Sequence, residues 1–179
     1  MYLSSERLNQ YLNIPEVSYK IITLWDNKLI VLKCGYVFKK DIHTKKWKLM
    51  NFNKPNGKYK RINLYNNNKE ILRVYIHRLV YYAFNQSIFD IFNSSVKTNT
   101  IDHINGDTSD NRLSNLRNVS NQENHFNKKC KGYCYRKDRN EWEAKIMLNR
   151  KTIHLGRFDT KWEARLCYLL NKRFYHKIK

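Results

Sequence analysis

Hydrophobic and polar residues alternate along several short segments, which predicts an α+β protein rich in antiparallel strands. The alternation is clearest in a hairpin at residues 58–76, where Ile62 and Leu64 fall on one face. The other face carries Tyr59, Arg61, Asn63 and Tyr65. Three shorter strands are expected before the hairpin, at 29–32, 35–38 and 47–50, after one or two turns of helix within residues 1–18. Segment 1–57 is therefore β-rich, and its role stays open.

The spacing changes directly after the hairpin. Apolar residues at positions 76, 79/80 and 83 recur at the interval of a short amphipathic helix. His77 falls at the start of this helix. We expect it to make a hydrogen bond there; the alternative is that His77 reaches a catalytic site.

Strand, strand and helix are predicted between residues 100 and 127. The first strand covers 100–104, turns at Asn105-Gly106-Asp107 and returns, after a polar loop, at 116–119. Ser120 and Glu123 have the spacing of a capping box, in which each side chain bonds the backbone of the other residue. This box begins a helix and places Asn124 in its first turn.

Residues 131–179 predict three antiparallel strands and a closing helix. The strands are expected at 132–136, 141–148 and 151–157, with a tight turn at Asn149-Arg150 between the last two. Thr160 and Glu163 form a second capping box. An apolar stripe then runs down the helix, and we expect it to pack on the sheet. The stripe consists of Trp162, Leu166, Leu169, Leu170 and Phe174.

Charge points to a polyanionic partner. The 179 residues include 35 Lys and Arg against 15 Asp and Glu, a formal charge of +20. Residues 128–179 alone hold 16 basic and 5 acidic residues, so the open face of their sheet is expected to be strongly basic. Such a charge favours nucleic acid. The hairpin face with Tyr59, Arg61 and Asn63 suits a DNA groove, with an ordinary solvated face as the alternative.

The sequence contains no apolar run near the roughly 18 residues of a spanning helix, and its first residues lack the pattern of a signal peptide. We therefore expect an intracellular protein without a membrane segment. The four cysteines are expected to be thiols. Zinc at Cys130, Cys134 and His125 is a weaker alternative, because no second cysteine pair is present.

Candidate chemistry gathers between residues 102 and 124. Asp102 offers a hard oxygen ligand and Asn124 an amide oxygen, both suited to Mg²⁺. The His103 imidazole can take a proton from water at neutral pH, and Asn115 could hold its other ring nitrogen. Neighbours in an ideal strand point to opposite faces, so Asp102 and His103 can converge only at a twisted or broken strand end.

These residues resemble the HNH family, in the subgroup of phage and viral homing endonucleases. The matching positions are Ile101-Asp102-His103-Ile104-Asn105-Gly106-Asp107, Asp110-Asn111-Arg112, Asn115-Leu116-Arg117 and Glu123-Asn124, preceded by His77-Arg78-Leu79-Val80 and Phe84. The resemblance implies a ββα-metal fold that cuts DNA with a divalent metal, Mg²⁺ or Mn²⁺. It implies Asp102 and Asn124 as metal ligands, His103 as general base and Asn115 as its orienting residue.

The chain departs from the HNH pattern in two places. Asn118-Val119-Ser120 stands where family members often have Trp-Val-Thr. His125, beside Asn124, is an alternative second ligand.

The last 50 residues resemble a second family, the ethylene-response-factor (Apetala-two) DNA-binding domain. The match rests on Gly132, Trp142, Glu143-Ala144-Lys145-Ile146, residues 154–160 and Glu163-Ala164. It implies a sheet that enters the major groove. DNA contacts are implied at Lys131, Arg136, Lys145 and His154, while Cys134 and Met147 replace usual arginines.

The sequence thus predicts three parts: a β-rich region at 1–57, a ribbon and HNH core at 58–128, and a DNA-binding domain at 131–179. We expect a monomeric, site-preferring nickase of duplex DNA, with Arg117 added to its DNA contacts. A DNA-binding regulator with an inactive core is the alternative. An RNA-binding or RNA-cleaving protein is a third reading, which competition between duplex DNA and RNA would test.

Overall fold

The computed structural model describes residues 2–13, 17–52, 58–87, 89–92, 100–127 and 130–177. The chain forms two compact units, Met1–Asn118 and Val119–Lys179. The expected boundary residues Gly57 and Lys128 lie outside the described residues. The three-part division therefore stays a prediction, whereas the expected α+β class is confirmed.

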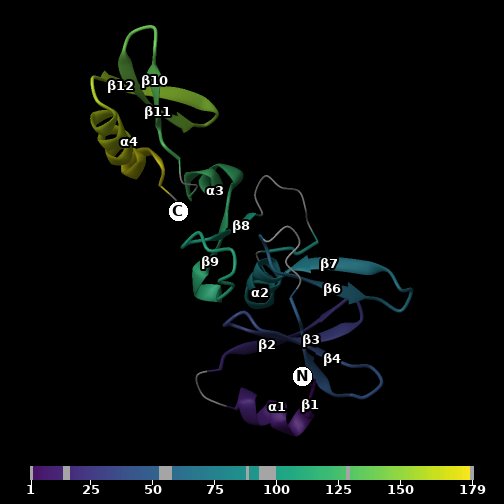
Figure 1. The fold of residues 1–179 in the computed structure, drawn as a ribbon. Coiled ribbons are helices and arrows are strands. Elements are labelled where there is room, and N and C mark those ends of the chain that lie inside the picture. Colours follow the sequence, from purple (N-terminus) through teal and green to yellow (C-terminus); the bar gives the residue numbers. More distant parts are fainter. Residues whose placement is uncertain are drawn as a thin grey trace. The chain divides into compact units, whose positions relative to one another are not determined.

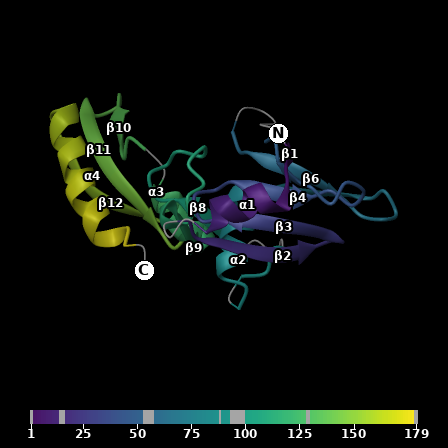
Figure 2. The ribbon, with the colours of Figure 1, turned by 90° about the horizontal axis from the view of Figure 1, so that it is seen from below.

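The first unit is built on an antiparallel sheet. Within its described part, five strands lie in the order β1-β5-β4-β3-β2. They are β1 (Tyr2–Leu3), β2 (Tyr19–Leu24), β3 (Asn27–Leu32), β4 (Val37–Lys40) and β5 (Trp47–Leu49). Helix α1 (Ser5–Leu12) lies on one side of the sheet in Figure 1 and crosses in front of it in Figure 2. The other side of the sheet faces α2 and the hairpin β6–β7 (Figure 1).

Alternating residues of β3 divide the unit into two hydrophobic cores. Ile30 joins the smaller core with Leu8 and Leu12 of α1, while Leu29 and Val31 join the larger core. This is the period-two alternation of a strand that is covered on both faces. The segment whose role the sequence left open is thus the platform on which the rest of the first unit is packed.

The hairpin and the following helix complete the larger core. β6 (Arg61–Tyr65) pairs with β7 (Ile71–Tyr75), and Ile62 and Leu64 point inward as predicted. α2 (Ile76–Phe84) buries Ile76, His77, Leu79, Val80 and Ala83, which confirms the amphipathic spacing. β8 (Thr100–His103) pairs with β9 (Leu116–Val119) after a 3₁₀ turn, η2 (Leu113–Asn115).

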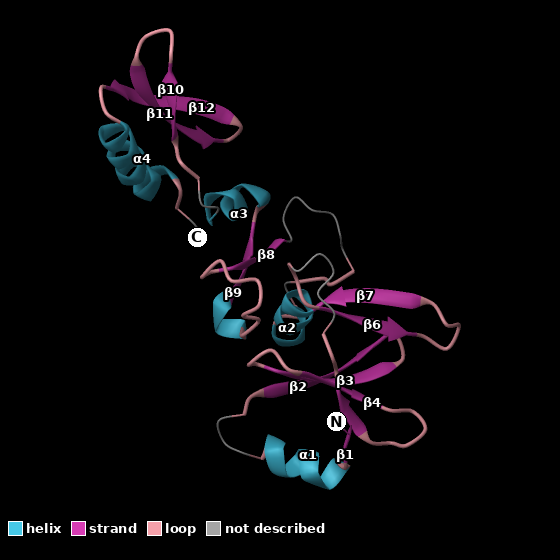
Figure 3. Ribbon diagram, viewed as in Figure 1, coloured by secondary structure: helices cyan, strands magenta, loops and turns pink. Residues whose placement is uncertain are grey.

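In the second unit, α3 (Asn121–Asn127) begins at the predicted capping box. The Ser120 backbone N–H donates to Glu123 Oε2 at 2.8 Å, and the Glu123 N–H donates to Ser120 Oγ at 3.2 Å. Over residues 130–177, β10 (Tyr133–Arg136), β11 (Glu141–Leu148) and β12 (Lys151–Phe158) form one antiparallel sheet. Figure 3 shows α4 (Lys161–Tyr175) along one face of that sheet.

The expected packing of the apolar stripe of α4 is wrong. The helix buries Ala164 and Tyr168, while Trp162 is 70% and Phe174 68% exposed. The reason is a close approach between chain segments: a Cβ at Gly132, whose φ is +75°, would overlap the ring of Tyr168. The Tyr168 ring therefore packs directly against Gly132, and the apolar stripe of α4 faces outward.

Candidate nuclease site

The site is built around His103, which ends β8 and is 4% exposed. Its Nε2 lies 3.3 Å from Oδ1 of Asn111, itself buried. Because Asn111 Nδ2 donates to the Ser109 carbonyl at 3.3 Å, Oδ1 faces the histidine and can only accept. An acceptor at this distance favours the tautomer of His103 that carries its ring proton on Nε2. A histidine whose tautomer is favoured by a held acceptor is suited to act as a general base.

Asn115 closes the loop that carries Asn111. Its Oδ1 accepts from the Asn105 N–H at 3.0 Å, and its Nδ2 donates to Asn105 Oδ1 at 3.0 Å and to the Asp110 carbonyl at 2.8 Å. The sequence predicted that Asn115 holds the His103 ring. In the structure the Asn115 side chain is engaged within the loop, and the partner of His103 Nε2 is Asn111. A direct role of Asn115 at the ring stays a prediction.

The loop is also anchored from outside. Lys60 Nζ donates to the Ser109 carbonyl at 2.9 Å, and Thr108 Oγ1 donates to the Lys58 carbonyl at 2.5 Å. The Leu113 N–H donates to the Lys33 carbonyl at 2.9 Å. These bonds tie the loop both to the segment before β6 and to the turn after β3. The N-terminal sheet therefore helps to fix the residue that orients the histidine.

Asp102 faces a different neighbour from His103, as adjacent strand residues do. Its Oδ2 accepts from Arg117 Nε at 3.1 Å and Nη2 at 2.8 Å. The carboxylate is 9% and the arginine side chain 26% exposed. Arg117, predicted to contact DNA, is therefore held by the predicted metal ligand. Its other guanidinium protons remain able to meet a phosphate, since arginine has five donors.

The residue types present fit a hard divalent cation. Mg²⁺ usually takes only one or two carboxylates and keeps water and phosphate oxygens as its other ligands. Asp102 is a carboxylate, which is a hard oxygen ligand of this kind. No cluster of three or more His, Cys, Asp or Glu residues occurs in the described part of the chain. Asn124, the second predicted ligand, lies half-buried in α3 of the second unit, beside an exposed His125.

The hairpin places its predicted DNA contacts differently. Arg61 and Asn63 lie on the outer face of β6, opposite Tyr75 and Arg73 of β7. Arg61 Nε and Asn63 Oδ1 are buried and make no hydrogen bond within the described residues. Tyr59 precedes the strand, and its ring lies 6.1 Å from that of His103, measured between centroids. Tyr59 therefore borders the histidine site.

The open face of the second unit's sheet is less purely basic than expected. Glu143 lies near its centre, 2.9 Å from Arg136 Nε and 3.1 Å from His154 Nε2. Burial acts to raise the pKa of Glu143, but a hydrogen bond from Cys134 and the charges of Arg136 and His154 outweigh it and lower that pKa. Two predicted contacts are thus paired with a carboxylate. Lys131 and Lys145 are exposed.

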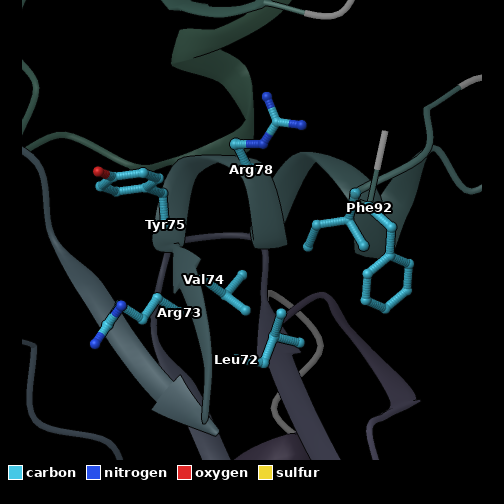
Figure 4. Close-up of a pocket in the computed structure, with 7 residues that line it drawn as sticks. Leu72, Arg73, Val74, Tyr75, Arg78 and Phe92 are labelled. Atoms are coloured by element: carbon cyan, nitrogen blue, oxygen red, sulfur yellow. The ribbon is translucent and has the colours of Figure 1, made fainter. Parts of the chain in front are cut away.

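A small pocket lies next to the histidine site without including it. Its volume is about 60 Å³, and Figure 4 shows Arg78, Tyr75 and Phe92 around it. Its wall shares only Tyr75 with the rings around His103. The pocket is mostly apolar and offers no carboxylate, so the candidate chemistry stays at β8.

Asn111 was given no role from the sequence, although it belongs to the motif that resembles HNH nucleases. Its burial at 5% exposure in a polar loop is the structural sign of its importance, because buried amides need partners. By residue type alone Asn105, Asn111 and Asn115 offer the same acceptor, and the resemblance pointed to Asn115. Only the path of the loop decides which amide reaches the ring.

Residues 92–126 match the model of a family described as HNH endonuclease. No curated protein and no solved structure matches the chain. The matched segment contains His103, Asn111 and Asn115, so it coincides with the site. It supports an HNH domain and nuclease activity on DNA. Among the described residues no helix is long and apolar enough to cross a membrane.

Because His77, which lies beside His103, is buried, we expect the protein to lose stability in acid. Burial, together with the nearby charges of His103 and Arg78, lowers the pKa of His77 to about 3. In the unfolded chain His77 therefore binds a proton near pH 6.5, whereas in the folded chain it binds one only near pH 3. The free energy of unfolding falls as pH falls between these values. For one group its slope is at most about 1.4 kcal/mol per pH unit.

Unfolding free energies of wild type and His77→Phe, measured by urea titration between pH 7 and pH 4, test this. We expect a steeper decline for wild type, because phenylalanine does not titrate. Equal slopes for the two proteins would contradict the prediction.

Proposed function

We propose that this protein is a divalent-metal-dependent endonuclease that hydrolyses phosphodiester bonds in duplex DNA. The observation that carries the proposal is the contact between the buried His103 ring and Asn111 Oδ1, at the end of the strand that also carries Asp102. The family match over the same residues supports it. The finer reading is a monomeric, site-preferring nickase of the phage or viral homing type, which rests on the resemblance of the sequence.

In this proposal His103 is the general base. A water molecule gives a proton to His103 Nδ1 while its oxygen forms a bond to phosphorus, and one ester P–O bond breaks. Asn111 Oδ1 accepts a hydrogen bond from Nε2–H throughout, so it stabilises the imidazolium that forms. The departing oxygen takes a proton from solvent. Asn115 contributes by closing the loop that holds Asn111.

Asp102 and Asn124 would hold the cation, Mg²⁺ or Mn²⁺, with His125 as the alternative to Asn124. When bound, the cation supplies positive charge for the phosphate and for the leaving oxygen. Arg117 holds the Asp102 carboxylate through two donors and offers its remaining donors to a phosphate oxygen.

DNA is gripped by residues outside the core in this proposal. Arg61 and Asn63 lie on a ribbon face whose two strands contain no carboxylate. The sheet of residues 131–179, similar to Apetala-two domains, binds a groove through Lys131 and Lys145. Arg136 and His154 adjoin Glu143, so they contribute orientation to that face as well as charge.

A second candidate function is a DNA-binding regulator with an inactive core. The ion pair between Arg117 and Asp102 favours it, because it neutralises the carboxylate that a metal would need. The two functions make different predictions for cleavage but the same one for binding.

Conversion of supercoiled plasmid separates the two functions. We expect wild type with Mg²⁺ to give open circles, and EDTA, Asp102→Ala and His103→Ala to prevent this while the Kd for duplex DNA changes no more than about threefold. The exposed His43 provides a matched control, since His43→Ala should cleave normally. Tight binding without conversion in any metal would favour the regulator.

The salt dependence of binding tests the second unit's role. Each phosphate contact adds about 0.9 to the slope of log K against log salt. We expect the double variant Lys131→Ala, Lys145→Ala to lower that slope by about 2. The exposed residues Lys20 and Lys28 of the N-terminal sheet serve as a charge-matched control pair. Equal slopes for the two double variants would remove this sheet from the DNA contact.

A further inference from the structure

The proposed base and three other rings from separate elements form one cluster. They belong to Tyr59, which precedes β6, Tyr75 at the end of β7, His77 in the first turn of α2, and His103. The His77 ring is the common neighbour of the other three. Its centroid lies 5.1 Å from that of His103, 5.2 Å from that of Tyr59 and 5.7 Å from that of Tyr75.

The way in which His77 is held is unusual for a buried histidine. The residue is 7% exposed, and its Nδ1 is buried without a hydrogen-bond partner among the described residues. The expected hydrogen bond at the helix start is therefore not found at this atom. A buried polar atom left unpaired costs stability. The ring is consequently placed by its contacts with the surrounding rings.

The charge state of His77 suits a neighbour that becomes positive. Burial first, and then the charges of His103 and Arg78, keep the pKa of His77 far below neutrality. A neutral imidazole beside His103 adds no positive charge when His103 accepts a proton. A lysine or arginine at this position would oppose that protonation.

We propose that His77 is a positioning residue for His103: it packs against the ring of the base and, with Tyr59 and Tyr75, fixes the direction of that ring. The inference rests on the proposed function for its consequence, since His103 must be the base. It adds a second restraint to the hydrogen bond from Asn111. One restraint acts at the Nε2 edge of the ring and the other on its side.

The ring contacts can be measured in the free protein, without DNA or metal. In wild type we expect NMR cross-relaxation between ring protons of His103 and those of His77 and Tyr59. His77→Ala should abolish the contact between His103 and Tyr59, because the ring that lies against both is gone. His77→Phe should keep it, since a flat ring remains. Unchanged cross-relaxation between His103 and Tyr59 in His77→Ala would overturn the proposal.

Single-turnover cleavage then tests the consequence. We expect His77→Ala to cut about 10- to 100-fold more slowly, with the Kd for duplex DNA within twofold, because a misplaced base loses rate and leaves affinity unchanged. His77→Phe should stay within about threefold of wild type. If His77→Phe is folded but as slow as His77→Ala, then a ring nitrogen is needed and the packing role is wrong.

Tyr81→Ala provides the matched control for lost stability. Tyr81 lies on the same helix and packs edge-on against Phe89, 5.4 Å between centroids, away from His103. Equal slowing of His77→Ala and Tyr81→Ala, in proportion to their lowered Tm, would reduce His77 to a structural residue. If wild type itself does not cleave, the proposed function fails, while the ring contacts still decide whether His77 positions His103.

Discussion

The site depends on one hydrogen bond, between His103 Nε2 and Asn111 Oδ1. In the proposed function this bond favours a ring proton on Nε2 and leaves Nδ1 to act as the base. Asn111 is held in turn by a loop that Asn115 closes and that Lys60 anchors. A hydrogen bond between two loosely held side chains would not fix the orientation of the His103 ring. Here the contacts of the loop hold Asn111 in place, so its bond can orient the ring.

The N-terminal sheet takes part in the site through backbone contacts. The carbonyl of Lys33 receives the N–H of Leu113, and a Cβ on Gly35 would lie 3.1 Å from the Asn111 carbonyl oxygen. Gly35 has φ +98°, a conformation that glycine adopts without strain. The sheet's tight turn can therefore approach the loop closely. A segment without chemistry of its own thus supports the residue that orients the base.

Local signals predicted most elements, since a capping box or a hairpin needs only residues that are neighbours in sequence. The box at Ser120 and the inward pair Ile62 and Leu64 are confirmed for that reason. The outward stripe of α4 was missed because it depends on how closely Tyr168 approaches Gly132, a contact between distant segments. The partnership of Asn111 with His103 was missed for the same reason. Residue types indicated the chemistry, and the loop path decided the partners.

The role of Asn111 is tested by the single-turnover rate of duplex cleavage by Asn111→Ala. We expect a rate about 100-fold below wild type at unchanged Kd for DNA, because the His103 ring loses the acceptor that favours its tautomer. Asn66→Ala is the control, since the Asn66 side chain bonds only within the exposed turn of the hairpin. Cleavage by Asn111→Ala at the wild-type rate would contradict the account.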